Sequence, residues 1–170
     1  AERRVPRIAA EIATRLLAEG RAGDAFACIE GAEAETARRV SRDWQDVRLA
    51  VLEALGRKEE AQLFRLACFE RDLSPDLLRA YLKRLPDFED IEAEDRAMAH
   101  VASHPDLLSA LGFFLDWPAP DRAGGLLIAR QDELDGDRYD ILGPAAEILL
   151  ERQPLAATLA LRAMIDFALN

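Results

Sequence analysis

One four-residue pattern occurs twice in this chain, displaced by 36 residues. It consists of Leu16, Gly20, Arg21 and Ala25, and then of Leu52, Gly56, Arg57 and Ala61. A displacement of this size is typical of stacked helical hairpins, because one hairpin is too small to bury its own apolar face. The pattern therefore predicts an α-solenoid, in which antiparallel helix pairs are sheltered by the pairs before and after them.

The composition supports an all-α fold. The chain has 31 Ala and 26 Leu, whereas Val, Ile and Thr together number 16. Ala and Leu are strong helix formers, and β-branched residues favour strands. Half of the residues are apolar and about a third are charged, which excludes a disordered chain and a membrane span.

Apolar periodicity, glycines and prolines divide the 170 residues into five helix pairs, an average of 34 residues each. This is the period of tetratricopeptide-like repeats. We expect one helical-repeat domain over residues 1–170, and the abrupt ends indicate a fragment of a longer protein. The predicted pairs are 8–19 with 24–31, 47–56 with 59–71, 76–85 with 87–102, 106–116 with 121–134, and 138–152 with 155–169.

Several local features of these helices are predicted from capping and breaking residues. Asp24 is expected to cap the second helix, after a turn made by Gly20 and Gly23. Asp87 is expected to cap the sixth helix. Ser74 and His104 are each followed by Pro, which is favoured at the first helical position behind a capping residue.

Three further features concern helix length and packing. The Ala- and Glu-rich segment 31–40 extends the second helix, before a break at 41–43. The helix over 59–71 is apolar nearly all round, so we expect neighbours to enclose it. Pro144 should kink or restart the helix in which it lies.

Charge and cysteine content limit the partners and the compartment. The formal net charge is −10, which should repel DNA and RNA. Cys28 and Cys68 lie in apolar helix patterns without a CxxC motif, and the chain has no secretory signal. We interpret both as reduced core residues of a cytoplasmic protein that does not bind membranes.

The two runs over residues 67–88 and 154–169 resemble an uncharacterised proteobacterial family of unknown function. The resemblance covers most of the chain from Ile8 onward. It implies an all-helical, tetratricopeptide-like region near the end of a longer protein, and it brings no catalytic or cofactor-binding residues. Members of that family continue past the position of Leu169 with a basic, His-containing helix, so the resemblance also implies that a terminal cap is missing here.

No set of residues predicts a metal, cofactor or catalytic site. His100 and His104 have helical i, i+4 spacing, but no third ligand is evident and Pro105 should end the helix beside His104. Ser41, Ser74, Ser103 and Ser109 are explained by helix ends, and no nucleophile elbow or phosphate-binding loop is present. Gly124 and Gly125 are expected to let two helices approach closely.

Two kinds of residue are candidates for binding a partner. Trp44 and Trp117 lie at helix boundaries and could anchor a partner, but bracing the adjoining helices is the favoured interpretation. If the first helices of successive pairs line one concave face, the residues best placed to contact a partner are Arg15, Arg48, Tyr81, Arg84 and Asp116.

These observations favour a non-catalytic scaffold that binds a protein or peptide. One alternative is a regulatory or substrate-recruiting domain of a larger enzyme. Another is an RNA-binding helical repeat. A repeat period near 35 and abundant Arg favour this alternative, whereas the acidic net charge argues against it.

Overall fold

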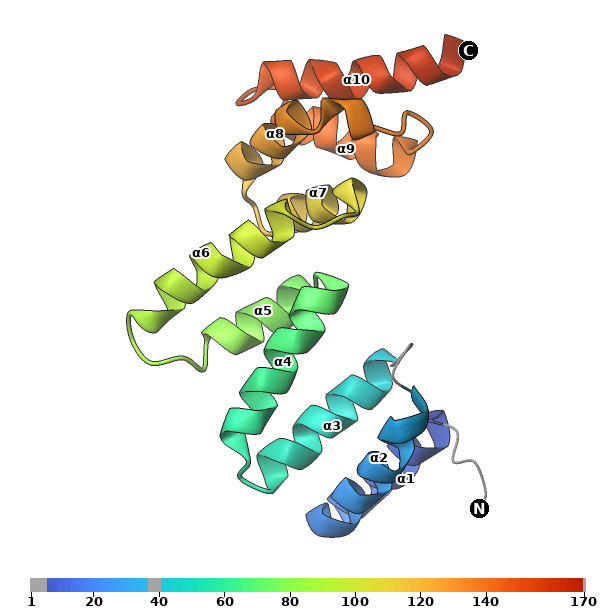
Figure 1. Ribbon diagram of the computed structural model, residues 1–170, viewed down its shortest axis with the longest axis vertical. Coiled ribbons are helices and arrows are strands. Elements are labelled where there is room, and N and C mark those ends of the chain that lie inside the picture. Colours follow the sequence, from blue (N-terminus) through green and yellow to red (C-terminus); the bar gives the residue numbers. More distant parts are fainter. Residues whose placement is uncertain (1–5, 37–40, 170) are drawn as a thin grey trace. The chain divides into compact units, whose positions relative to one another are not determined.

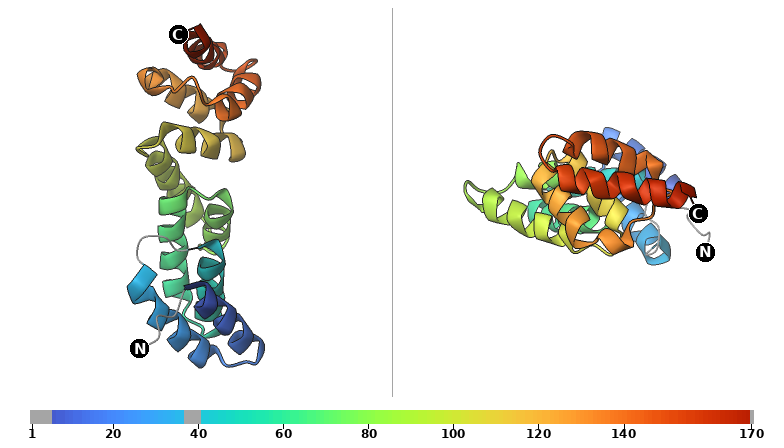
Figure 2. Two further views of the ribbon diagram at one scale, coloured as in Figure 1. Left: turned by 90° about the vertical axis from the view of Figure 1, so that its right-hand side faces the viewer. Right: turned by 90° about the horizontal axis from the view of Figure 1, so that it is seen from above.

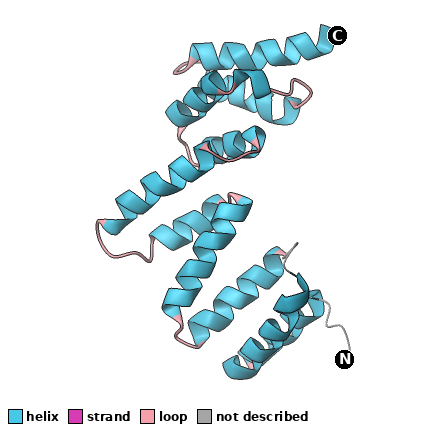
Figure 3. Cartoon of the chain, viewed as in Figure 1, coloured by secondary structure: helices cyan, strands magenta, loops and turns pink. Residues whose placement is uncertain are grey.

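The chain is described by a computed structural model that covers the backbone of residues 6–36 and 41–169 and the side chains of residues 8–31 and 41–169. Within these ranges every regular element is helical and no strand is present (Figure 3). The all-α prediction is therefore confirmed. The helices labelled in Figure 1 are α1 (Pro6–Ala18), α2 (Ala22–Thr36), α3 (Arg42–Ala54), α4 (Lys58–Asp72), α5 (Pro75–Leu82), α6 (Glu89–Ala102), α7 (Leu107–Asp116), α8 (Pro120–Ala129), the 3-10 turn η1 (Gln131–Glu133), α9 (Tyr139–Leu149) and α10 (Pro154–Leu169).

Each of the ten predicted helices corresponds to one α-helix of the described residues, with boundaries that differ by a few positions. The largest differences are five residues: α3 begins at Arg42 instead of 47, and α8 ends at Ala129, so that the predicted remainder to residue 134 is a 3-10 turn and a loop. The extension of α2 into the Ala- and Glu-rich segment is confirmed as far as Thr36, and residues 37–40 lie outside the described residues. None of the helices in the described ranges combines the length and apolar character needed to cross a lipid bilayer.

The chain divides into two compact units, Ala1–Cys68 and Phe69–Asn170, with the boundary inside α4. Each unit is described by itself. A single helical-repeat domain over residues 1–170 stays a prediction.

The repeated sequence pattern forms the same helix-ending turn twice in the first unit. Gly20 and Gly56 adopt φ values of 74° and 70°, in the left-handed region that glycine occupies without strain. In both turns the next residue donates its N–H to a carbonyl five positions back, from Arg21 to Leu16 at 2.8 Å and from Arg57 to Leu52 at 2.9 Å. This is the Schellman arrangement, which satisfies carbonyls at the helix end.

The two arginines that follow these glycines form equivalent ion pairs. Arg21 pairs with Asp24 at 2.7 Å and Arg57 pairs with Glu60 at 2.6 Å, both three residues further along the chain. The Arg57 guanidinium also lies 4.3 Å from the ring centroid of Phe26 on α2. The second turn is therefore packed against α2 of the first hairpin.

The core of the first unit is built around Trp44. Its ring is buried and meets Phe64 of α4 edge-on, with the centroids 6.0 Å apart. The helices α1, α2 and α3 contribute the other buried residues of this cluster, Ala10, Ala13, Ala25, Ile29 and Val51. Trp44 is thus a core residue, as the favoured interpretation holds.

In the second unit, α7 contacts α8 and α9, and α10 contacts α8 and α9. The pair α7 and α8 therefore packs against the pair α9 and α10. In Figure 2, α10 is the dark red helix, and it lies on the side of α8 and α9 that faces away from α7. The most apolar helix is α7, which buries Leu107, Leu108, Ala110, Leu111, Phe113 and Phe114.

Aromatic side chains connect the earlier helices of this unit to α7. Phe69 lies 5.7 Å from Phe113, and Phe113 stacks on Trp117 at 5.6 Å, as measured between ring centroids. Trp117 donates its indole N–H to Glu94 of α6 at 2.9 Å, and the guanidinium of Arg79 on α5 lies 5.0 Å from its ring. Trp117 thus braces three helices.

Three predicted caps are wrong, because each helix begins at another residue. The helix α2 begins at Ala22, so Asp24 and Gly23 lie inside it and Asp24 binds Arg21. The N-cap of α6 is Phe88 with φ 74°, so Asp87 lies before the cap.

The third wrong cap is His104. The N-cap of α7 is Asp106, whose side chain accepts the N–H groups of Leu108 and Ser109, and Pro105 precedes the helix. Ser74 with Pro75 and Ser41 cap α5 and α3. The prediction for Ser74 is therefore confirmed, and the expected break at 41–43 coincides with the start of α3.

Three packing predictions have mixed outcomes. Pro144 lies inside α9, which continues through it without a restart. Gly124 is confirmed as a close approach, because a Cβ there would lie 2.7 Å from the Gln153 side chain, whereas a Cβ at Gly125 would meet nothing within 4 Å. Enclosure of the helix over 59–71 is wrong, since Leu63 on α4 is 69% exposed.

We predict that the cap at Asp106 stabilises the chain in a pH-dependent way. The hydroxyl of Ser109, followed by backbone N–H groups, holds the pKa of Asp106 below its ordinary value. A lowered pKa gives stability that is present above the pKa of the unfolded chain and is lost as the pH falls through the folded pKa. Replacing Asp106 by Ala should cost about 1 kcal/mol at neutral pH.

The measurement is thermal or urea unfolding followed by circular dichroism at a series of pH values. Asp106→Asn is the matched control, because Asn also caps helices but does not titrate. Equal stability of wild type and Asp106→Ala at neutral pH would contradict the assignment of this cap.

Candidate functional site

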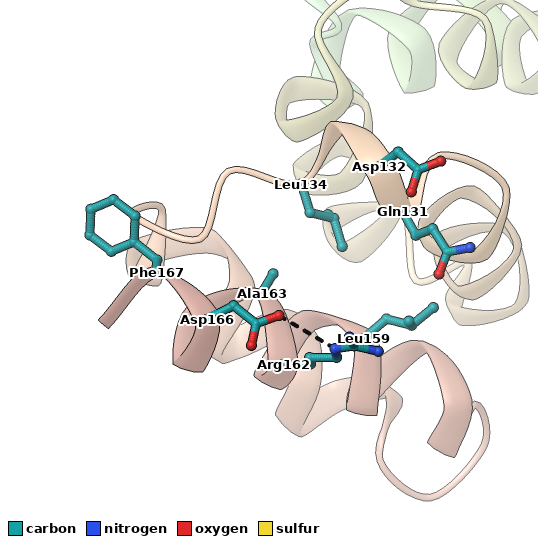
Figure 4. Close-up of a pocket in the computed structure, with 8 residues that line it drawn as sticks. All are labelled: Gln131, Asp132, Leu134, Leu159, Arg162, Ala163, Asp166 and Phe167. Carbon is teal, nitrogen blue, oxygen red and sulfur yellow. Dashed lines mark hydrogen bonds and ion pairs between the residues drawn. The ribbon is translucent and has the colours of Figure 1, made fainter. Parts of the chain in front are cut away.

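An open cavity of about 400 Å³ lies in the second unit between η1, the loop after it and α10 (Figure 4). Figure 4 shows Leu134 pointing from the loop toward Ala163, and Arg162 joined to Asp166 on the helix. The lining residues are Gln131, Asp132, Leu134, Leu159, Arg162, Ala163, Asp166 and Phe167.

The loop that closes one side of this cavity is fixed to α10 at two points. Gly136 is buried, and a Cβ at this position would lie 2.1 Å from the carbonyl oxygen of Ala163. Tyr139 donates its hydroxyl to the carbonyl of Met164 at 3.4 Å, and its ring meets Phe167 edge-on with centroids 6.3 Å apart. The loop and the start of α9 are therefore held against the same part of α10 that lines the cavity.

The start of the loop is tied to the rest of the unit by Arg130. Its Nη1 and Nη2 donate to the carbonyls of His104 at 2.7 Å and Pro105 at 3.1 Å, and it pairs with Glu133. The same arginine borders a second, smaller cavity of about 290 Å³, which is lined by Ala102, Phe114, Arg122, Gly125, Leu126, Ala129 and Arg130.

The segment over residues 130–140, which includes η1, the loop after it and the start of α9, is strongly acidic. Residues 130–140 contain five carboxylates and two guanidiniums, a net charge of −3. Hydrogen bonds from Arg130 hold the pKa of Glu133 below its ordinary value, and those from Arg138 do the same for Asp140. Three carboxylates of this segment, Asp132, Asp135 and Asp137, form no ion pair with another described residue. One of them, Asp132, lines the cavity.

The chemistry of the lining suits binding. The Arg162 guanidinium and the Gln131 amide can donate hydrogen bonds, and the carboxylates of Asp132 and Asp166 can accept them. Leu134, Leu159 and Phe167 provide apolar contact. The titratable residues of the lining are Asp132, Arg162 and Asp166, and the eight lining residues include no Ser, Cys, His or Lys.

The solvent side of α10 next to this cavity is apolar. Leu161, Ile165 and Leu169 are spaced by four residues, so they follow one face of the helix. They are 43%, 57% and 81% exposed. We call these three residues the outer face of α10; Arg162 lies between the outer face and the cavity.

The five predicted partner-contacting residues are distributed over both units, and none lines either cavity described above. In the first unit, Arg15 is exposed near the end of α1. The guanidinium of Arg48 lies 5.3 Å from the ring centroid of Trp44 and 4.7 Å from that of Phe64. It therefore packs on the core aromatic rings.

The other three predicted residues are in the second unit. Tyr81 is half-buried on α5, and Arg84 is exposed just after this helix, where its Nη1 donates to the Ala80 carbonyl at 2.8 Å. Asp116 is exposed, and its backbone carbonyl accepts from Arg79 of α5 at 3.1 Å. Contact of any of the five with a partner stays a prediction.

The histidines and two of the serines make hydrogen bonds within the fold, and only that of His100 joins residues far apart in the sequence. Nε2 of His100 lies 2.9 Å from the Glu70 carbonyl, and Nδ1 of His104 accepts the Asp106 N–H at 3.2 Å. The hydroxyl of Ser103 donates to the His100 carbonyl, and that of Ser109 donates to Asp106. In the part of the chain that is described, no group of three His, Cys, Asp or Glu side chains could hold a metal ion.

Sequence reasoning did not assign the cavity. The acidic run at 132–135 is visible in the sequence, but its charge does not show which distant helix it lies beside. The four-residue spacing of Leu161, Ile165 and Leu169 is the other available signal, although an apolar stripe more often faces a core. Nothing in the sequence brings residue 132 next to residue 162.

The DUF6880 family, described as a family of unknown function, matches residues 1–170, and the chain therefore belongs to it. No curated protein and no solved structure matches the chain.

We predict that Gly136 is required for the cavity. A Cβ at this position would overlap the Ala163 carbonyl, so Gly136→Ala must push the loop away from α10. Overpacking of this kind costs about 1–3 kcal/mol. Gly125→Ala is the matched control, because its Cβ has free space and Ala is favoured over Gly in a helix by about 1 kcal/mol.

Thermal unfolding of the two variants measures this difference, with a lower midpoint for Gly136→Ala and an unchanged or higher midpoint for Gly125→Ala. If Gly136→Ala is as stable as the wild type, the described contact between the loop and α10 is wrong.

Proposed function

We propose that this member of the DUF6880 family is a non-catalytic interaction module that holds a segment of another protein against α10. The docking surface consists of the cavity beside η1 together with the outer face of α10. The observation that carries the proposal is the exposure of Leu161, Ile165 and Leu169 next to an open cavity.

Exposed apolar side chains gathered on one helix face are unfavourable in water unless something covers them. Scattered single apolar residues on a surface are ordinary, whereas contiguous ones mark interaction sites. Phe167, which is 49% exposed, adds an aromatic side chain at the cavity, and aromatic residues are favoured anchors at interfaces. A segment lying along α10 would cover both parts of the surface.

The architecture agrees with this function. We interpret the consecutive helix pairs as repeats of a tetratricopeptide-like α-solenoid, a class of protein that mostly presents surfaces for binding. The buried thiols of Cys28 and Cys68 suit the cytoplasm. The five predicted partner-contacting residues remain candidates for a further surface, since none of them lines either of the two cavities described above.

The proposal is tested by selecting short peptides from a random library against the whole chain. Affinities of the selected peptides are then measured by calorimetry for the wild type and for Ile165→Asp. We expect Ile165→Asp to weaken binding about tenfold or more, because a carboxylate would be buried on an apolar contact. Both the position and the new side chain are exposed in the free protein, so the fold should persist.

Leu63→Asp is the matched control, since Leu63 is an exposed apolar residue on α4, in the first unit. Selected peptides should bind this variant as they bind the wild type. The proposal fails if no peptide is selected, or if Ile165→Asp and Leu63→Asp have the same effect.

A further inference from the structure

We infer that the segment held on α10 presents a basic side chain, Lys or Arg, next to an aliphatic or aromatic one. This inference rests on the proposed function and adds the chemistry of the partner to it. The basic side chain would reach Asp132 at the edge of the cavity, and the apolar side chain would lie on Leu159.

The charge of the surroundings favours a cation over an anion. The loop over residues 130–140 has a net charge of −3, and α10 contributes one Arg and one Asp, which cancel. The whole chain, residues 130–140 included, carries −10, so its long-range field attracts basic segments and repels acidic ones.

The carboxylate of Asp132 is also available to a ligand. Asp132 forms no ion pair with a described residue and is exposed. Asp166 pairs with Arg162 at 3.4 Å, but the two side chains are 60% and 74% exposed. Solvated pairs of this kind are weak, so a bound cation can share Asp166 with Arg162.

The apolar part of the lining explains why a peptide, and not a simple cation, is expected. Half of the lining residues are apolar and cannot attract a cation by charge. A ligand gains free energy from them only if it buries an apolar group against them; these residues are Leu134, Leu159, Ala163 and Phe167. A cavity of about 400 Å³ is large enough for one side chain and part of a backbone, and the outer face of α10 continues the contact beyond it.

The experiment uses four synthetic peptides that differ in two adjacent central residues: Lys-Leu, Glu-Leu, Gln-Leu and Lys-Gly. Binding to the whole chain is measured by fluorescence anisotropy at low and at raised salt. We expect the Lys-Leu peptide to bind most tightly and the Glu-Leu peptide least tightly, with the difference shrinking as salt screens the charges.

Two variants locate the effect. Asp132→Asn should weaken binding of the Lys-Leu peptide about fivefold, the size expected of one exposed ion pair, and should leave the Gln-Leu peptide unchanged. Asp137→Asn is the matched control, because it removes the same charge from the same loop at a position that does not line the cavity. It should change the affinity for neither peptide by more than about twofold.

The outcomes separate this inference from the function on which it rests. Equal binding of the Lys-Leu, Gln-Leu and Glu-Leu peptides, all lost in Ile165→Asp, keeps the docking module and overturns the basic preference. Tighter binding of the Glu-Leu peptide, or equal effects of Asp132→Asn and Asp137→Asn, also overturns it. If no peptide binds and Ile165→Asp changes nothing, the proposed function fails as well.

Discussion

The helices of this chain pack through alanine, and the rest of the structure depends on that close approach. Alanines without exposed surface lie on most of the helices, among them Ala13, Ala25, Ala110, Ala145 and Ala160. Small side chains let helix backbones come near one another, so dispersion contacts are made along the whole length of short helices. Helices of 8 to 16 residues are marginal alone in water, so tertiary packing supplies most of their stability.

Close packing of short helices requires turns that end each helix abruptly. Left-handed glycines at 20 and 56 provide two of them, and the arginine after each glycine is held by an acidic partner three residues on. In the second unit an arginine also holds a connection between helices in place, because Arg130 donates hydrogen bonds to two carbonyls of the segment between α6 and α7. The segment that follows is therefore held at Arg130 and again at Gly136, where it meets α10. The cavity lies between this segment and α10.

The sequence predicted the number, order and approximate limits of the helices, because apolar periodicity and proline are local signals. It was less successful with caps. Asp24 and Asp87 have the right residue type, but a cap also needs the backbone conformation of the residue before the helix, and packing decides where that occurs. Trp44 was correctly assigned to the core, whereas Leu63 was wrongly expected to be enclosed, since helical periodicity does not show which face has a neighbour.

By itself, the sequence determined the helical class, the repeated turn at Gly20 and Gly56, and an acidic surface, because each follows from residue types at short spacing. Tertiary structure alone decided that Asp132 and Arg162, thirty residues apart, border one cavity, and that Leu161, Ile165 and Leu169 lie uncovered beside it. The reason is physical: a local pattern fixes which residues share a helix face, but only the packing of other helices fixes which faces remain open to a partner.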